Sequence, residues 1–385
     1  MLYLKVKKGI CCMNIAIWGA GRFGEYIYSQ VSTNDKIKVI CIIDSNIRED
    51  KKKYFKEIDI VSPLVYMEKY NAETDVVLVA FFGSIAILEE LKNLKIKRYG
   101  FICRRVFTYK IPLNDILESN ENIIWNDDEE LKRICLDTLE TNVVDFCNLN
   151  CKGCSHFSNL YSKGSQTSYQ RFEQDIKQLA TKIFILQFNL LGGEVFLSDK
   201  LFEYIACLKK YMPKTKIELI SNGLIIPYLD KELLEYIKMN DVTIDITEYL
   251  PTSIILDKIK NTLEMYKIRY TIRPLAQTFG KNIDLTGKNN PFIAMNNCRE
   301  SKCQFLREGK IYKCPFTSLG NKFFEYYNIP IHFDEGINIY DETLDWNNEI
   351  TKICNEPLDA CRYCGVEEKF SWERSDTPKK EEWLI

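Results

Sequence analysis

Short apolar runs alternate with amphipathic stretches along most of the chain. Runs rich in β-branched residues predict buried strands, and apolar residues spaced three and four apart predict helices that pack on them. In the first hundred residues the predicted strands are 14–18, 38–43, 75–80 and 98–102, and the predicted helices are 25–31 and 85–94. This alternation is typical of an α/β unit with an open parallel sheet.

The same alternation returns in the middle of the chain. The predicted strands there are 139–146, 184–191, 216–220, 242–247 and 269–273, and the predicted helices are 172–183, 200–210, 230–239 and 252–265. Repeated strand–helix units imply a parallel sheet, and functional residues in such sheets lie at the carboxyl ends of the strands. We therefore expect a site at that edge.

Residues 111–128 interrupt the pattern because they are rich in Asn, Asp and Glu. We predict an α/β protein with an N-terminal unit over 1–110, a linker over 111–130, a central unit over 131–290 and a small cysteine-rich α+β extension over 291–385.

The composition is that of an ordinary soluble protein, with 46% hydrophobic and 28% charged residues among 385. The formal net charge is −2 and no long basic run occurs, so nothing indicates nucleic-acid binding. The longest apolar run, 76–88, is too short to span a bilayer, and no secretion signal is recognisable. We expect a cytoplasmic protein without a membrane partner.

A glycine pattern, Gly19-x-Gly21-x-x-Gly24, joins the first predicted strand to the first predicted helix. Such a turn lets phosphates approach the backbone at a helix N-terminus. Asp44, at the end of the next strand, is placed to accept hydrogen bonds from ribose hydroxyls. The pattern predicts a Rossmann-type unit that binds a nucleotide; NAD is one candidate, and a docking unit without a nucleotide is the alternative.

Fifteen cysteines are many for a chain in a reducing compartment, where metal ligation is more common than disulfides. Cys147, Cys151 and Cys154 follow a predicted strand at C-x3-C-x2-C spacing. Three thiolates can hold three irons of a 4Fe–4S cluster and leave the fourth iron open. The alternative is zinc, for which His156 is the nearest fourth ligand.

Other cysteines lie in or beside apolar segments and are interpreted as small buried hydrophobes. They are Cys11, Cys12, Cys41, Cys103, Cys135 and Cys207.

The triad spacing resembles the signature of the radical S-adenosylmethionine (SAM) superfamily. The turns Gly192-Gly193-Glu194, Ser221-Asn222-Gly223 and Thr247-Glu248-Tyr249 at the predicted strand ends resemble its partial (βα)6 TIM barrel. By that resemblance the residues that contact SAM are Gly192, Gly193 and Glu194, together with Asn222 and Glu248.

One position departs from the family, because Gly153 replaces the usual aromatic residue before the third cysteine. Phe157 is our candidate for the adenine contact that this ring would make. His156 is either a substrate contact or proton donor, or a hydrogen-bonded structural residue.

A second group of cysteines lies near the C-terminus, and the segment from Gly309 to Cys314 predicts a hairpin that presents a thiolate. The spacing resembles the shorter, twitch version of the SPASM-type extension, which holds one auxiliary 4Fe–4S cluster. The ligands by this resemblance are Cys298, Cys314, Cys361 and Cys364. Cys303 is the alternative to Cys298, Cys354 is spare, and structural zinc is the alternative metal.

The resemblance implies an enzyme that splits SAM reductively to a 5′-deoxyadenosyl radical, which abstracts hydrogen from a substrate. The electron would come from a flavodoxin- or ferredoxin-type reductant. The auxiliary cluster would accept an electron from the substrate radical, relay electrons or ligate substrate.

The N-terminal unit resembles the UDP-sugar-binding domain of some bacterial sugar acyltransferases. The stretch 147–157 and the residues from Trp372 to Trp383 are similar to radical SAM proteins of surface polysaccharide synthesis. We expect a nucleotide-linked or glycan sugar as substrate. The alternatives are a peptide-modifying radical SAM enzyme, an NAD-dependent oxidoreductase with structural zinc, and a cluster-bearing regulator.

Overall fold

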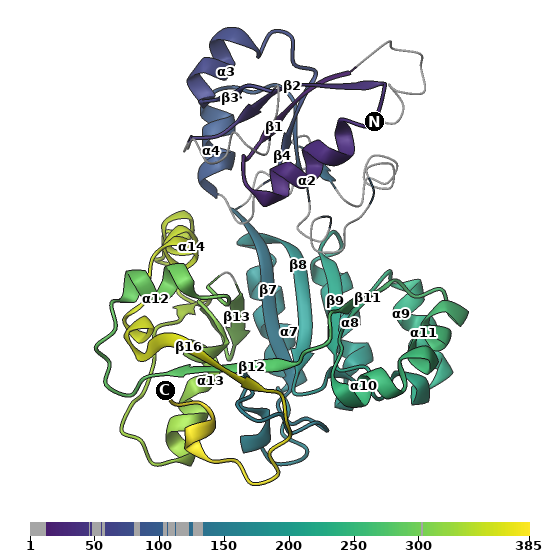
Figure 1. Ribbon diagram of the computed structural model, residues 1–385, viewed down its shortest axis with the longest axis vertical. Coiled ribbons are helices and arrows are strands. Elements are labelled where there is room, and N and C mark those ends of the chain that lie inside the picture. The colour runs from purple at the N-terminus through teal and green to yellow at the C-terminus, as the bar shows by residue number, and fades with distance from the viewer. Residues whose placement is uncertain are drawn as a thin grey trace. The chain divides into compact units, whose positions relative to one another are not determined.

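The computed structural model describes residues 13–45, 47, 55, 58–80, 85–102, 106, 112, 123–125, 134–301 and 303–385. The chain divides into two compact units, Met1–Asp137 and Thr138–Ile385 (Figure 1). Within the described residues no helix combines the length and apolar character needed to cross a membrane.

The first unit is built on a sheet whose described strands lie in the order β3-β2-β1-β4-β5-β6. These strands are β1 (Met13–Trp18), β2 (Ile37–Ile43), β3 (Ile60–Val61), β4 (Val76–Val79), β5 (Tyr99–Ile102) and β6 (Ile123–Trp125). The first five pair in parallel, and β6 pairs with β5 in antiparallel fashion. The helices are α2 (Arg22–Val31), α3 (Pro63–Lys69) and α4 (Ile85–Asn93).

Strand β1 is buried on both faces, which explains its continuous apolar sequence. Ile15 and Ile17 belong to one core cluster, which also contains Ile27 of α2. Ala16 and Trp18 belong to the other, together with side chains of α3 and α4. Successive side chains of a strand point to opposite faces, so the two clusters lie on the two sides of the sheet.

Strand β6 falls within the range 111–130 that the sequence assigned to a linker. Apart from residue 112, the remainder of that range lies outside the described residues. Cys11, Cys12 and Cys103 also lie outside them. Cys41 is fully buried, as the apolar surroundings in the sequence predicted.

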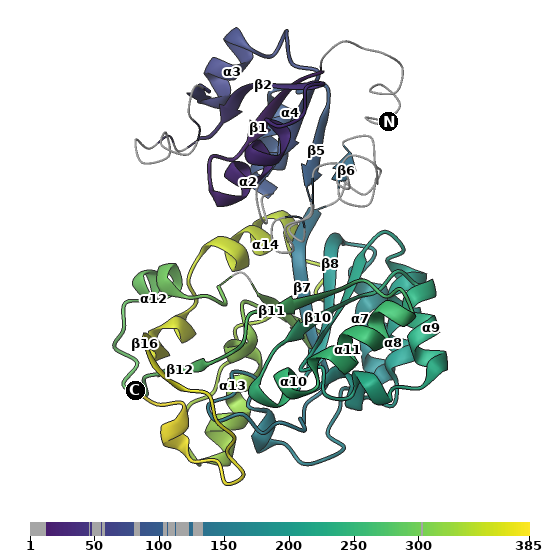
Figure 2. The ribbon, with the colours of Figure 1, turned by 45° about the vertical axis from the view of Figure 1, so that its right-hand side comes forward.

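The second unit contains a larger described sheet with the order β11-β10-β9-β8-β7-β13-β14-β15 (Figures 1 and 2). Its strands are β7 (Ile134–Val144), β8 (Ile183–Gly192), β9 (Lys216–Ser221), β10 (Thr243–Thr247), β11 (Tyr270–Arg273), β13 (Gln304–Arg307), β14 (Lys310–Tyr312) and β15 (Ile337–Asn338). Strands β8 to β11 pair in parallel, and β13 is parallel to β7.

Helices separate the parallel strands along the chain, as the sequence predicted. They are α7 (Tyr169–Leu179), α8 (Leu201–Tyr211), α9 (Lys231–Met239), α10 (Leu250–Ile254) and α11 (Leu256–Met265). Helix α7 buries Phe172, Ile176 and Leu179, the residues whose spacing predicted it. The single helix predicted over 252–265 is instead two helices, since the backbone leaves the helical conformation at Ile255.

The sheet departs from the six strand–helix units implied by the family resemblance. Five strands, β7 to β11, are adjacent in chain order, but the next strand, β12 (Thr278–Ile283), pairs in antiparallel fashion with β16 (Cys364–Ser371). Only residues 274–277 separate β11 from β12, and a parallel crossover needs a dozen residues or more. On the other edge β13 extends the sheet beside β7.

The C-terminal part of the unit packs on this edge with three helices, α12 (Pro291–Asn297), α13 (Pro315–Tyr326) and α14 (Trp346–Asn355). Strands β13 and β14 form an antiparallel hairpin, which confirms the turn predicted before Cys314. An aromatic core cluster joins α13 to the loop after the cysteine triad through contacts of Phe157 with Phe316 and Phe323.

Candidate functional site

The three cysteines of the triad lie on one loop that leaves the carboxyl end of β7. Cys151 is buried with Leu149, and Cys147 and Cys154 pack against the same small cluster. Asn150 and Gly153 have positive φ angles, 50° and 60°, which turn the loop tightly. Burial raises the pKa of Cys147 and of Cys151 to about 12. Thiols in this setting stay protonated at neutral pH until a metal displaces the proton.

Two glycines allow the end of β8 to lie directly against this loop. A Cβ atom on Gly192 would lie 2.0 Å from the carbonyl oxygen of Val144, and one on Gly193 would lie 2.1 Å from that of Phe146. The backbone N–H of Gly193 donates to Val144 over 2.9 Å. No other residue fits at either position without moving the loop, so the Gly-Gly pair is required by the close approach.

Glu194, the third residue of this turn, is fully buried and ties β8 to β9. Its carboxylate accepts from the Ser221 hydroxyl at 2.7 Å and from the backbone N–H of Asn222 at 2.8 Å. Desolvation raises its pKa to about 7 despite these donors. The side chain therefore holds two strand ends together beside the cysteine loop.

Asn222 reaches the cysteine loop from the end of β9. Its side-chain amide donates to the Asn148 side chain at 2.7 Å and lies 3.8 Å from Sγ of Cys147. Glu248, after β10, accepts from the Ser253 hydroxyl at 2.5 Å. The neighbouring Tyr249 packs beside the triad. The polar residues predicted at successive strand ends thus lie along one edge, which is the arrangement expected of a parallel sheet.

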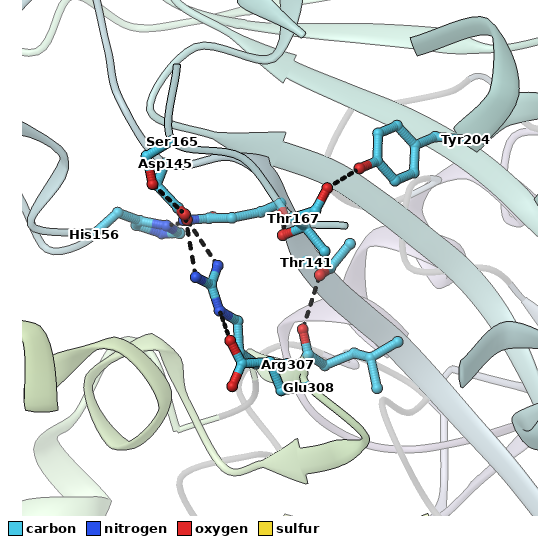
Figure 3. A network of polar contacts seen from close by, with 10 residues as sticks. Thr141, Asp145, His156, Ser165, Thr167, Tyr204, Arg307 and Glu308 are labelled. Atoms are coloured by element: carbon cyan, nitrogen blue, oxygen red, sulfur yellow. Dashed lines mark hydrogen bonds and ion pairs between the residues drawn. The ribbon is translucent and has the colours of Figure 1, made fainter. Parts of the chain in front are cut away.

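A buried ion pair anchors the loop from the other side (Figure 3). Arg307, on β13, donates to both carboxylate oxygens of Asp145 at 2.7 and 3.1 Å. Nδ1 of His156 lies 3.0 Å from the Asn142 side-chain oxygen, and burial lowers the pKa of His156 to about 4. A neutral, hydrogen-bonded imidazole agrees with the structural one of the two roles considered for this histidine.

The C-terminal segment covers the cysteine loop. The indole N–H of Trp372 donates to Sγ of Cys151 at 3.2 Å, and that of Trp383 donates to the carbonyl oxygen of Cys154 at 2.9 Å. A Cβ atom on Gly153 would lie 2.7 Å from the carbonyl oxygen of Glu382 and 2.8 Å from the Phe370 ring. The C-terminal segment thus occupies the space that an aromatic residue at position 153 would need.

Phe157, the sequence-based candidate for an adenine contact, is only 2% exposed. Its ring packs against Phe323 and Trp383, with centroids 5.7 and 5.8 Å away. The aromatic residues grouped with the triad are instead Tyr249, Phe279 and Trp372. Phe279 and Trp372 follow the triad by more than a hundred residues, so the spacing of the cysteines could not show that these two rings lie beside it.

The second cysteine group also comes together. One pocket is lined by all four predicted ligands, Cys298, Cys314, Cys361 and Cys364. Cys303 and Cys354 do not line it. Cys314 follows the β13–β14 hairpin at the start of α13. Burial raises the pKa of Cys314 to about 12. Glu300 lies near this group, and desolvation, followed by the charge of Glu140, raises its pKa to about 7.

In the first unit the glycine turn has the geometry that its pattern predicted. Gly19 has a φ of 121°, and a Cβ atom on Gly24 would lie 1.8 Å from the carbonyl oxygen of Gly19. No heavy atom lies within 4 Å of the Cβ position of Gly21, which precedes α2. The Asp44 carboxylate accepts from the backbone N–H of Ala20 at 2.8 Å, so it also braces the turn.

Sequence reasoning missed a row of polar residues on one face of the parallel strands. The side-chain amide of Asn189 donates to Glu140, and that of Gln187 donates to Glu218, both at 2.9 Å. Arg273 pairs with Asp245, which is fully buried. These polar residues recur with a period of two within apolar strands, and this was the signal that could have identified them.

The donor set of the triad loop suits an iron–sulfur cluster. Three cysteine thiols lie on this one loop, and the Trp372 indole and the Asn222 amide supply donors near two of the sulfurs. In the part of the chain that the structure describes, no three His, Cys, Asp or Glu side chains are already gathered as a site for a metal ion. The fit therefore rests on the thiol loop and on its surrounding donors.

Comparison with known proteins places residues 141–272 in a named family, whose model is described as the radical SAM superfamily. This segment runs from β7 to β11 and contains the triad. No curated protein sequence matches the chain.

The chain is similar to several solved structures. Native anSMEcpe with bound AdoMet matches with a TM-score of 0.29 and 18% identity, over 35% of this chain and 43% of that chain. BtrN in complex with AdoMet and 2-DOIA matches with a TM-score of 0.36 and 15% identity, over 60% of this chain and 92% of that chain. SuiB from Streptococcus suis matches with a TM-score of 0.32 and 11% identity, over 81% of this chain and 79% of that chain.

The match spans less than half the length of anSMEcpe. The family match covers the strands that carry the triad, the Gly-Gly turn and Asn222. Residues 141–272 therefore form a radical SAM superfamily domain.

Proposed function

We propose that this protein binds a 4Fe–4S cluster through Cys147, Cys151 and Cys154 and cleaves SAM reductively to modify a nucleotide-linked or glycan sugar. The observation that carries the first part is the position of the three thiols on one loop beside the Gly192-Gly193 turn and Asn222. When bound, the cluster and SAM supply a 5′-deoxyadenosyl radical for hydrogen abstraction.

The residues of the chain position and shield these groups. Gly192 and Gly193 offer backbone groups beside the cysteine loop, since no side chain separates the two. Asn222 and Glu248 extend the polar edge along which SAM would lie. The Glu194 carboxylate is occupied by Ser221 and Asn222, so we assign it the role of holding this edge in shape.

We propose a second 4Fe–4S cluster on Cys298, Cys314, Cys361 and Cys364. Their shared pocket supports this assignment and favours Cys298 over Cys303 as the first ligand. Four thiolates from separate segments can close a fully ligated cluster or a structural zinc site. The resemblance to a twitch extension favours iron. A cluster bound there would accept the electron that a substrate radical loses on oxidation.

We propose that the first unit is Rossmann-like and binds a nucleotide sugar, with NAD as the other candidate. The strand order β3-β2-β1-β4-β5 and the open space at Gly21 support a phosphate site at the start of α2.

The electron would come from a flavodoxin- or ferredoxin-type protein. A cytoplasmic location supplies such reductants, and we propose that location for this protein. Surface polysaccharide synthesis would then consume the modified sugar.

The decisive experiment is anaerobic reconstitution of the full chain, followed by reduction in the presence of SAM and assay for 5′-deoxyadenosine. We expect a brown protein with about eight iron atoms per chain, from two clusters of four. Replacement of Cys147, Cys151 and Cys154 by Ala should abolish the product. A colourless protein that holds zinc and yields no product would contradict the proposal.

The auxiliary site needs its own variant. Cys361→Ala combined with Cys364→Ala should leave about four iron atoms per chain and retain SAM cleavage without substrate. Loss of all iron from this pair of substitutions would place the two cysteine sets in one site and contradict the assignment.

Substrate class is tested by calorimetric titration of the full chain with UDP-sugars and, separately, with NAD. Binding of a UDP-sugar in the micromolar range would support a sugar substrate. Binding of a peptide and of no nucleotide would favour peptide modification instead.

A further inference from the structure

Trp372 makes a side-chain hydrogen bond to a sulfur of the triad. Its indole N–H lies 3.2 Å from Sγ of Cys151, although 221 residues separate the two positions in the chain. Both side chains are buried, with exposed fractions of 9% for Trp372 and 7% for Cys151. The donor therefore competes little with water for this sulfur.

The backbone on either side of the tryptophan is tied to the same loop. The N–H of Lys152 donates to the carbonyl oxygen of Glu373 at 2.9 Å, and the N–H of Ser375 donates to that of Asn150 at 2.7 Å. Tyr249 packs on the indole with a ring-centroid distance of 5.4 Å. These contacts hold the indole N–H toward the sulfur and restrict other orientations.

A hydrogen bond to a cluster sulfur has a defined electrostatic consequence. Reduction adds one electron, and the added negative charge spreads onto the thiolate sulfurs. An N–H donor stabilises the more negative, reduced state more than the oxidised state. Reduction potentials of such clusters depend on hydrogen bonds to the sulfurs and on exposure to solvent.

We propose that Trp372 is a positioning residue that raises the reduction potential of the cluster on Cys147, Cys151 and Cys154 through its N–H···S contact with Cys151. This inference rests on the proposed function, because it assumes that the triad holds a 4Fe–4S cluster. It assigns the C-terminal segment a part in the electron-transfer step, in addition to covering the loop.

The chain offers a matched control for this contact. Trp383 belongs to the same segment and also donates its indole N–H to the loop, but to the carbonyl oxygen of Cys154 at 2.9 Å. Trp372→Phe and Trp383→Phe each remove one N–H and retain an aromatic ring. Only the first removes a donor to sulfur.

The test is a redox titration of the reconstituted full chain without SAM, monitored by the electron paramagnetic resonance signal of the reduced cluster. At a fixed potential we expect the reduced-to-oxidised ratio in Trp372→Phe to fall about tenfold, which corresponds to a midpoint about 59 mV lower. Trp383→Phe should keep the midpoint of the unmodified protein. An unchanged midpoint in Trp372→Phe, or an equal shift in both variants, would overturn the proposal.

Two further measurements distinguish failure of the Trp372 inference from failure of the proposed function. A change of the reduced signal on addition of SAM identifies the triad cluster, so the proposed function can hold while the Trp372 inference fails. If Trp372→Phe does not retain iron, Trp383→Phe protein labelled with ¹⁵N at the indole nitrogens replaces it. Electron spin-echo modulation should then detect a ¹⁵N coupled to the reduced cluster, and absence of that coupling would overturn the inference.

Discussion

Arg307 and Asp145 form a two-pronged ion pair that joins the hairpin strand β13 to the start of the cysteine loop. The guanidinium donates to the two carboxylate oxygens at 2.7 and 3.1 Å, and the side chains are 16% and 2% exposed. Ser165 adds a third donor to the carboxylate at 3.2 Å. Figure 3 shows this carboxylate between the arginine and the serine. The pair connects the two parts of the second unit that carry the two cysteine groups.

Removal of one partner should therefore destabilise the second unit strongly. We expect Arg307→Met to lower the free energy of unfolding by about 3–5 kcal/mol, because it leaves the Asp145 carboxylate buried without its cation. Urea denaturation of the iron-free chain measures this loss. Lys231→Met is the control, since Lys231 and its partner Glu235 are both exposed and their loss should cost about 1 kcal/mol or less. Equal losses in the two variants would contradict the special role of the buried pair.

A single methyl group at Gly193 should displace the cysteine loop. The Cβ atom of Gly193→Ala would lie 2.1 Å from the Phe146 carbonyl oxygen and 2.7 Å from the Cys147 nitrogen, so strand and loop must separate. We expect loss of iron from the triad and of SAM cleavage. Gly164→Ala is the control, because its φ of 87° strains alanine but no heavy atom lies within 4 Å. Equal iron loading of the two variants would contradict the requirement for glycine at position 193.

Gly21 and Gly24 should respond in opposite ways to the same substitution. Gly21→Ala meets no atom within 4 Å, so the first unit should keep its stability while the added methyl group obstructs a phosphate. Gly24→Ala would lie 1.8 Å from the Gly19 carbonyl oxygen and should destabilise the unit itself. Thermal unfolding and UDP-sugar titration of both variants distinguish these effects. If Gly21→Ala binds the nucleotide as well as the unmodified protein does, the phosphate site lies elsewhere.

The triad should hold its metal more firmly as pH rises. Burial raises the pKa of Cys147 and Cys151 to about 12, so both thiols are protonated in the iron-free protein at neutral pH. Ligation requires thiolates, and each proton released changes the apparent affinity about tenfold per pH unit. Chelator-driven loss of the brown colour should accordingly slow between about pH 6.5 and pH 8.5. A loss rate independent of pH over this range would mean that the thiols are already ionised.

The local features of this protein were predictable from its sequence. Most of the parallel strands and the helices between them follow from the period of their apolar residues, and the Gly19 turn and the hairpin before Cys314 follow from glycine positions. Helices α3, α12, α13 and α14 were not predicted. The triad was recognisable because its three cysteines are neighbours in the chain. Each of these patterns depends on residues a few positions apart, where backbone geometry alone relates the side chains.

The tertiary structure decided which distant residues share a site. It brought Trp372 to Cys151, filled the space beside Gly153 with Phe370 and buried Phe157 in an aromatic core. It also turned β12 away from the parallel sheet and placed β13 on the opposite edge. These contacts depend on how whole elements pack against one another, and packing is set by shape and burial across the fold. Spacing along the chain carries little information about such contacts, so the sequence predicted the three cysteines as ligands but not the contacts that Trp372 and Phe370 make around them.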